Sequence, residues 1–327
     1  MTTPTTLSLP SGQDLHGEWR EAVLTLSLNG RFVASATGAE GCWQIKELAV
    51  DQESSLWCLA YWLLLRSTVD SLEWRGVSPE LANRSGLMIR RADGSLVTER
   101  TAFWQLPSPW LRQPAATPWP QTWISSGTTR HLRRPPKPDG EVYRRFDTRL
   151  ASWISLRTLD LRIDLPRFSR WQNSARVAAF WQEEGSLEQH RAYLQRLAED
   201  PHVQPLIGCF DDEPFAYFEV YWAKEDRIGP YYGVGDHDRG LHMLVGEEAH
   251  RGPHKVAGWL PAVAHFLFLD EPRTQRLVCE PRADNERMIA HLQRQGFYRQ
   301  KDFDFPHKRA ALMLLERERF FDRCVLA

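Results

Sequence analysis

The chain has 327 residues, of which 42% are hydrophobic, so it is long enough to bury a large core and to form two domains. Its 41 basic and 42 acidic residues nearly cancel, which excludes the basic field of a nucleic-acid-binding protein and a polybasic membrane anchor. The longest apolar run, residues 56–65, is half of the roughly 20 residues needed to span a bilayer.

The cysteines and histidines favour a reducing setting without a metal centre. The five cysteines form no CxxC pair and their number is odd, which is typical of reduced thiols rather than a disulfide framework. Histidines and cysteines show no metal-ligand spacing, so we expect no metal. The N-terminus has no cationic start followed by an apolar core, and it predicts no secretory signal. We therefore expect a cytoplasmic protein that binds neither nucleic acid nor a membrane.

Residues 1–106 are expected to form a small α/β or α+β domain. Leucine alternates with polar residues over 22–28 and is followed by Asn29-Gly30. This is a strong hairpin signal, because a type I′ turn needs positive φ at both central residues. A buried helix, a strand and a second hairpin turn are predicted at residues 52–67, residues 72–77 and Asp93-Gly94. The domain shows no set of residues typical of a catalytic site.

Residues 107–150 are expected to form an ordered connector that lies across two domains. Eight of the chain's 21 prolines lie within 107–138. Proline removes backbone donors and disfavours helix in the residue before it. Trp110, Trp119 and Trp123 lie in the same stretch, which is untypical of a flexible tether.

From residue 151 to residue 327 the pattern becomes regular and predicts the order β-α-α-β-β-β-α-β-α-β-β. Asp164 and Ser186 are the expected caps of the first two helices, and Gly252-Pro253 opens the third. The strands and the last two helices are expected at 152–158, 203–210, 214–223, 238–246, 253–269, 275–281 and 282–297, followed by two final strands.

Six segments from Ala102 onwards carry a family resemblance. They are AFWQLP, GEVYRRFD, PLIGCFDDEPFAYFEVYWAKEDRIG, DRGLHMLVGE, LDEPRTQRLVCEPRADN and FDFPHKR. In amino-acid sequence and element order they resemble the N(6)-hydroxylysine acetyltransferases of aerobactin siderophore biosynthesis, a branch of the GNAT superfamily. The resemblance implies an α/β (α+β) domain with the GNAT fold, whose mixed central sheet is splayed at the acetyl-CoA site.

The resemblance also implies an activity. Acetyl would pass from acetyl-CoA to the hydroxylated side-chain nitrogen of lysine, giving a hydroxamate that chelates Fe(III). Related siderophore acyltransferases share the segments HMLVG and EPRADN, so N-hydroxyornithine, N-hydroxycadaverine and a longer acyl-CoA stay open as substrates. A catalytically inactive domain that binds CoA or a partner is the alternative from another class. Other enzymes of the siderophore pathway stay open as partners.

The acetyl-CoA site is expected where strand 238–246 ends and the next helix starts. Pantetheine would pair with the last main-chain groups of the strand, as an added strand does. The pyrophosphate would sit on the first helix amides, where unpaired N–H groups and the dipole favour an anion. His254 and Val256 stand where the GNAT loop pattern has glycine. Leu292 stands where GNAT enzymes often carry a tyrosine that protonates the leaving thiolate. The expected cofactor residues are Leu244, Val245, Gly246, Arg251, Gly252, Pro253, His254, Lys255 and Asn285.

His242 and Asp284 are the candidate catalytic residues. His242 interrupts an apolar strand, where histidine is more often a satisfied core residue, but related siderophore enzymes carry histidine at this place in the substrate cleft. Asp284 precedes a helix, where aspartate is a preferred N-cap, and it also follows a strand beside the splay, where it can accept a proton. Glu219 is a candidate for binding a cationic amine and Trp222 for walling the cleft, with a solvated edge and core packing as their alternatives.

Overall fold

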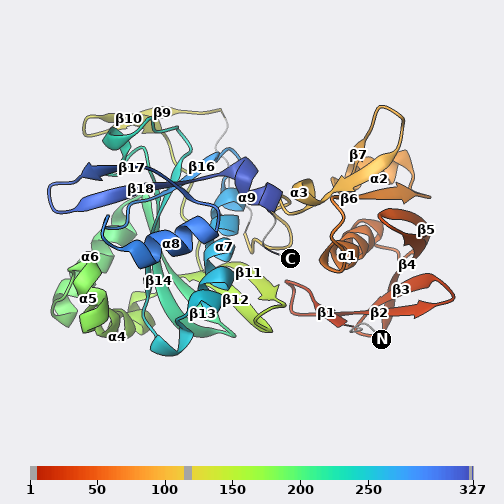
Figure 1. Ribbon diagram of the computed structural model, residues 1–327, viewed down its shortest axis with the longest axis horizontal. Helices are drawn as coiled ribbons and strands as arrows, with labels where there is room; N and C mark the ends of the chain where they lie inside the picture. Colours follow the sequence, from red (N-terminus) through yellow and green to blue (C-terminus); the bar gives the residue numbers. More distant parts are fainter. Residues whose placement is uncertain (1–5, 114–119, 324–325, 327) are drawn as a thin grey trace. The chain divides into compact units, whose positions relative to one another are not determined.

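The computed structural model describes residues 6–113, 120–323 and 326. The chain divides into two compact units, Met1–Pro109 with Ala327 and Trp110–Leu326 (Figure 1). The second unit therefore includes most of the segment that we expected to connect two domains. Trp119 of that segment lies outside the described residues.

The first unit is built on one eight-stranded sheet. Its elements are β1 (Thr6–Ser8), β2 (Asp14–Arg20), β3 (Val23–Leu28), β4 (Arg31–Ala39), β5 (Cys42–Leu48), α1 (Gln52–Leu65), β6 (Ser71–Arg75), α2 (Pro79–Ser85), β7 (Ile89–Arg90), β8 (Leu96–Glu99) and α3 (Arg100–Phe103). The predicted hairpin is confirmed, because Asn29 and Gly30 have φ values of 51° and 76° and join antiparallel β3 and β4. The second predicted hairpin joins β7 to β8, and the predicted buried helix is α1.

The second unit contains a two-stranded and an eight-stranded sheet. Its elements are β9 (Trp123–Ser126), β10 (Thr129–Leu132), β11 (Glu141–Asp147), β12 (Ser152–Thr158), α4 (Leu161–Gln172), α5 (Ala175–Trp181), α6 (Leu187–Glu199), β13 (Val203–Phe210), β14 (Glu213–Trp222), β15 (Arg239–Val245), α7 (Pro253–Asp270), β16 (Arg276–Cys279), α8 (Glu286–Arg294), β17 (Tyr298–Asp304), β18 (Arg309–Glu316) and α9 (Arg317–Arg323). Short 3₁₀ turns lie at Gly229–Tyr231 and Glu248–His250. The predicted order is confirmed, and β9, β10, β11, α5 and α9 are added to it.

The two large sheets share one strand order. It is β1-β2-β3-β4-β5-β6-β8-β7 in the first unit and β11-β12-β13-β14-β15-β16-β18-β17 in the second. In each, the fifth and sixth strands run parallel, and every other neighbouring pair of described strands is antiparallel. Helices α1 and α7 follow the fifth strands. The first unit has only Glu21-Ala22 where the second inserts α4, α5 and α6, so it repeats the fold without those helices.

Helices cover both faces of the second unit's large sheet. Side chains of α4, α5 and α6 pack with Tyr217 of β14 and Leu244 of β15 in one buried cluster. Phe218, the next residue of β14, contacts Trp259 of α7, with ring centroids 5.4 Å apart. Because side chains alternate across a strand, Glu219 and Tyr221 share the face of Tyr217 beneath α4–α6.

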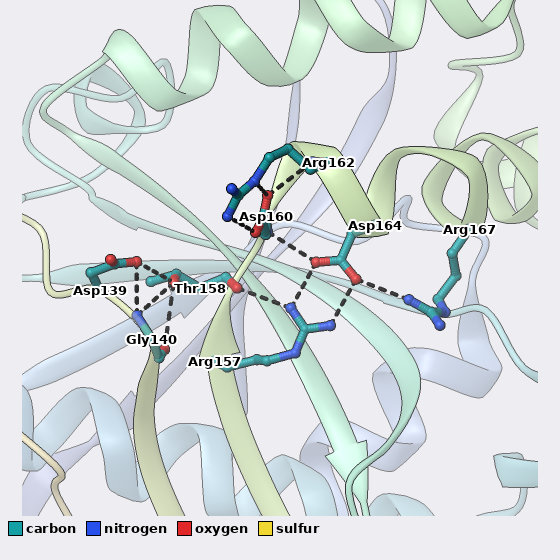
Figure 2. Close-up of polar contacts among 8 residues, drawn as sticks. All are labelled: Asp139, Gly140, Arg157, Thr158, Asp160, Arg162, Asp164 and Arg167. Atoms are coloured by element: carbon teal, nitrogen blue, oxygen red, sulfur yellow. Dashed lines mark hydrogen bonds and ion pairs between the residues drawn. The ribbon is translucent and has the colours of Figure 1, made fainter.

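The start of α4 differs from the prediction. Asp160, not Asp164, is the N-cap, and its side chain accepts from the amide of Arg162. The carboxylate of Asp164 is buried. It accepts hydrogen bonds from both terminal nitrogens of Arg157 at 2.7 Å and from one terminal nitrogen of Arg167 at 2.9 Å (Figure 2). A buried carboxylate needs such partners, so Asp164 fastens α4 to the end of β12. The second cap is confirmed, because Ser186 forms a capping box at the start of α6.

The sheet opens between β15 and β16. These strands pair only at Arg239 with Leu277 and at Gly240 with Val278, although β15 continues to Val245. On its other edge, β15 stays paired to β14 along its whole length. The predicted splay is therefore confirmed, and it begins after Gly240.

Two hydrogen bonds show which main-chain groups of β15 face the opening. The amide of Ala223 donates to the carbonyl of Asp238, and that of Gly246 to the carbonyl of Phe215. Antiparallel pairing alternates, so the even-numbered residues of β15 turn their N–H and C=O groups towards β14. The main-chain groups of Leu241, Met243 and Val245 consequently point into the gap.

Candidate active site

His242 lies between two buried carboxylates where the gap begins. It stands opposite Glu219 in the β14–β15 register, and its Nδ1 is 2.9 Å from Glu219 Oε2. Its Nε2 is 2.6 Å from Oε1 of Glu280, the residue after β16. Three neighbouring strands thus place one charged cluster, Glu219–His242–Glu280, at the start of the gap.

Hydroxyl groups hold both carboxylates in place. Glu219 Oε1 accepts from Tyr193 of α6 at 2.5 Å and from Tyr217 at 2.9 Å. Glu280 Oε2 accepts from Tyr221 at 2.8 Å. These bonds fill lone pairs that burial would otherwise leave unsatisfied, so the cluster is rigid.

The charges of the cluster decide the protonation of His242. Burial by itself lowers the pKa of His242, but the charge of Glu280 and the hydrogen bonds of both carboxylates outweigh it and raise the pKa to about 10. Burial raises the pKa of each carboxyl, yet His242 more than offsets it, so the pKa of Glu219 falls and that of Glu280 drops to about 2. At neutral pH His242 is an imidazolium that donates both N–H groups, and it has no lone pair with which to take a proton.

Gly240 makes room for one of these hydroxyl groups. A Cβ built on Gly240 would lie 1.8 Å from the ring of Tyr221, which is closer than any real contact. The absence of a side chain lets the Tyr221 ring lie against β15 and reach Glu280 with its hydroxyl. This glycine therefore supports the site by close approach rather than by backbone conformation.

The start of α7 has the features of an anion site. Gly252 is the N-cap with φ 122°, and Pro253 is the first helical residue, as predicted. The amides of His254 and Lys255 lie in the first turn, where a helix provides no carbonyl partner. Arg251 is exposed beside them. Phosphate groups of a cofactor can bind here.

Arg176 of α5 already contacts the end of β15. One of its terminal nitrogens donates to the carbonyl of Val245 at 2.8 Å and to that of Gly246 at 3.0 Å. These two carbonyls belong to the residues that we expected to pair with pantetheine.

The structure does not join Asp284 to His242. The Asp284 side chain is 66% exposed and pairs with Arg282, with Oδ2 2.6 Å from a guanidinium nitrogen. The capping alternative for Asp284 is excluded, because Asn285 is the N-cap of α8 and its side chain accepts from the amide of Met288. A catalytic role for Asp284 and a cofactor contact for Asn285 stay predictions.

Trp222 lies away from the cluster. Its ring is stacked between the guanidinium groups of Arg134 and Arg239, at 4.1 and 4.3 Å from the ring centroid. Three positions beyond Glu219, it faces the opposite side of the sheet and lines a separate cavity of about 210 Å³ beside Pro135–Pro138. Glu219, a candidate for binding a cationic amine, contacts the imidazolium of His242, and its amine-binding role stays a prediction.

Glu280 is a candidate site residue that the sequence analysis does not predict. It lies in the EPRADN segment, in which Asp284 and Asn285 are the predicted site residues. The available signal was an acidic residue at the end of an apolar strand that runs parallel to the strand of His242. Tyr193 carried no such signal, because α6 reaches Glu219 only through the packing of the fold.

One group of side chains within the described ranges has the spacing of a metal site. The ligand atoms of His131, His202 and Glu225 lie within 4.8 Å of one another. The same Glu225 carboxylate accepts two bonds from Arg134, at 2.6 and 2.8 Å. A divalent cation bound here would share the Glu225 carboxylate with the guanidinium of Arg134, which favours an ion-pair cluster over a metal centre.

Across the described residues, no helix is long and apolar enough to cross a membrane.

Known proteins place this geometry in a family. Residues 160–305 match the family described as "Acetyltransferase (GNAT) domain". The chain is also 49% identical over 226 residues to the N(6)-hydroxylysine O-acetyltransferase of Escherichia coli, covering 69% of this chain and 71% of that protein. The chain belongs to the GNAT acetyltransferases. The gap between β15 and β16 is accordingly the GNAT splay, and the His242 cluster lies at its start.

Two further similarities agree with this membership. An N(5)-hydroxyornithine:cis-anhydromevalonyl coenzyme A-N(5)-transacylase from Beauveria bassiana is 46% identical over 200 residues, covering 60% of this GNAT chain and 44% of that protein. A crystal structure of an uncharacterised protein from Bacillus halodurans matches with a TM-score of 0.55 and 29% identity, covering 57% of this chain and 95% of that one.

Proposed function

We propose that this enzyme transfers acetyl from acetyl-CoA to the side-chain nitrogen of N(6)-hydroxylysine, giving a hydroxamate for an aerobactin-type siderophore. The observation that carries the proposal is the Glu219–His242–Glu280 cluster at the start of the splay. The similarity to a hydroxylysine acetyltransferase supports the acceptor. We expect the reaction in the cytoplasm, where acetyl-CoA is available and other pathway enzymes can supply the hydroxylated amine.

A weak general base in the protein is sufficient for a hydroxylamine acceptor. A hydroxylamine is far less basic than lysine, whose amine has a pKa of about 10.4, so its nitrogen is largely neutral and ready to attack the thioester carbon. After the C–N bond forms, that nitrogen carries an acidic proton. A carboxylate with a lowered pKa, such as Glu280, is basic enough to take it. The C–S bond then breaks, and the released CoA thiolate takes up a proton.

His242 has a positioning role in this proposal. Its imidazolium holds Glu280 and Glu219 and offsets their charge. The N–H groups of Met243 and Val245 face the gap and are suited to donate to the oxyanion that forms on the thioester carbonyl.

Two cations beside Glu280 favour an amino acid as the acceptor. A guanidinium nitrogen of Arg227 lies 3.8 Å from Glu280 Oε1, and its side chain is 51% exposed. The ammonium of Lys308 lies 4.0 Å from the same oxygen. Together they can receive an α-carboxylate, which N(6)-hydroxylysine and N-hydroxyornithine have and N-hydroxycadaverine lacks.

The deciding experiment is a competition between N(6)-hydroxylysine and lysine at equal concentration with acetyl-CoA. We expect acetylated hydroxylysine almost alone. Only about one lysine amine in 2,500 is unprotonated at pH 7. A site that hydrogen-bonds the hydroxyl can reject the analogue without it by roughly 10⁴-fold. Comparable acetylation of lysine would return the chain to ordinary amine acetyltransferases.

The same assay separates the remaining alternatives. A hydroxamate gives a coloured Fe(III) complex, whereas O-acetylation, named for the relative from Escherichia coli, leaves a free amine and no such complex. N-hydroxyornithine and longer acyl-CoA donors test the substrates suggested by the relative from Beauveria bassiana. An inactive CoA-binding domain would release no thiol with any of them.

A further inference from the structure

We infer that Arg176 is a cofactor-binding residue that occupies the pantetheine site when acyl-CoA is absent and moves to the phosphates when acyl-CoA binds. This inference deepens the proposed function, since it rests on acyl-CoA binding in the splay. It concerns α5, a helix that the amino-acid pattern did not predict and that carries none of the expected cofactor residues.

The first observation is a conflict over hydrogen-bond acceptors. Val245 turns its carbonyl into the gap, where an added strand would find it, but Arg176 donates to that carbonyl at 2.8 Å and to the carbonyl of Gly246 at 3.0 Å. A pantetheine amide that extends the sheet needs acceptors at this edge. The guanidinium and the pantetheine amide therefore compete for the same positions.

The second observation is that Arg176 is held incompletely. Its Nε is buried without a hydrogen-bond partner and forms only a long ion pair with Glu248 Oε1, at 4.0 Å. Burial lowers the pKa of Arg176, and the positive charge of Arg251 lowers it further. An anion beside both guanidinium groups would relieve this repulsion and satisfy the free Nε.

The third observation is that such an anion has a place nearby. Arg251 adjoins the N-cap Gly252 of α7, where first-turn amides favour phosphate. Guanidinium groups bind phosphate oxygens through paired, charge-assisted hydrogen bonds. A bound pyrophosphate would thus draw Arg176 away from β15 and leave the carbonyl of Val245 to pantetheine.

Helix α5 keeps Arg176 within reach of both positions. Arg282, which follows β16, donates to the carbonyl of Ala179 at 3.3 Å. At the end of α5, the ring centroid of Trp181 lies 6.4 Å from that of His242. The helix therefore extends from the end of β15 to the residues after β16. Towards α7, Arg176 Nε lies 4.0 Å from Oε1 of Glu248, four residues before the N-cap Gly252.

The test compares two ligands whose affinities should change in opposite directions. Calorimetry with Arg176→Ala should show CoA binding weakened by about 10- to 100-fold, the range of a hydrogen bond to a charged group. Pantetheine, which has no phosphates, should bind several-fold more tightly, because the carbonyl of Val245 is no longer occupied. Arg176→Lys should show smaller changes in the same directions in both affinities. It keeps a long cationic side chain and so serves as a second variant if Arg176→Ala misfolds.

Two control variants isolate the effect. Arg251→Ala should weaken CoA and leave pantetheine unchanged. Arg170→Ala removes an equal charge from α4, where Arg170 pairs with Glu247, and should change neither affinity. Parallel weakening of both ligands by Arg176→Ala, or no change in either, would overturn the inference. No acceptor is present in these titrations, so an error in the proposed acceptor would leave their outcome unaffected.

Discussion

At the scale of single residues, the contacts of His242 decide what the site can do. Both ring nitrogens donate to buried carboxylates, so the histidine cannot accept a proton. In the proposed reaction, one of the two carboxylates is the proton acceptor instead. Removing one partner of a buried ion pair typically costs about 3–5 kcal/mol, because the other charge is left uncompensated. A His242→Ala variant is therefore expected to lose stability as well as turnover.

Glu280→Gln and Asp284→Asn form a matched pair that tests the assignment. Each replaces a carboxylate by an amide of the same shape. We expect Glu280→Gln to lower kcat by about 100-fold or more, the size of a positioned proton-transfer group, and Asp284→Asn to have a smaller effect because that side chain is largely exposed. CoA affinity, measured alongside, should be unchanged in both. An equal loss in Asp284→Asn would give Asp284 the catalytic role that the sequence suggested.

The raised pKa of His242 predicts how stability depends on pH. In the unfolded chain its pKa is about 6.5, whereas in the folded protein it is about 10. The stabilisation is complete below pH 6.5 and is lost as the pH rises through 10, by up to about 1.4 kcal/mol per pH unit. Urea unfolding of the wild type and of His242→Gln at pH 6, 8 and 10 should show their difference shrinking. A constant difference would mean that His242 is neutral in the fold.

At the scale of elements, Gly240 lets β15 carry the site. Gly240→Ala would place a methyl group against the Tyr221 ring. We expect a lower melting temperature and a lower kcat, because the ring must move and its hydroxyl leaves Glu280. Gly233→Ala is the matched control, since nothing lies within 4 Å of a Cβ there. Equal behaviour of the two variants in melting and turnover assays would show that the close approach is unimportant.

At the scale of the whole molecule, the repeated strand order raises the question of a second cofactor site. Helix α1 occupies the position of α7 in the repeat, but it starts with Asp51 as N-cap and Glu53 in its first turn. These carboxylates repel phosphate, whereas α7 starts with Gly252 and has no acidic residue in its first turn. Calorimetry should therefore give one CoA per chain. A stoichiometry of two would assign a cofactor site to the first unit.

Local signals in the sequence determined much of this protein. Asn29-Gly30 forms the expected hairpin and Gly252-Pro253 the expected helix start, because turn and cap preferences depend on a few neighbouring residues. Apart from α5 and α9, the strand and helix order from Ser152 onwards follows from hydrophobic periodicity, and His242 stands out as a polar interruption of that pattern.

Only the tertiary structure decided which side chains meet. Glu280 reaches His242 because β15 and β16 run parallel and then separate, and Trp222 faces away because strand alternation puts it on the other side of the sheet. Asp164 is buried against Arg157 instead of capping a helix, and Arg176 reaches Val245 from a helix 69 residues earlier in the chain. These contacts join residues far apart in sequence, so their geometry depends on register and packing, which local patterns do not specify.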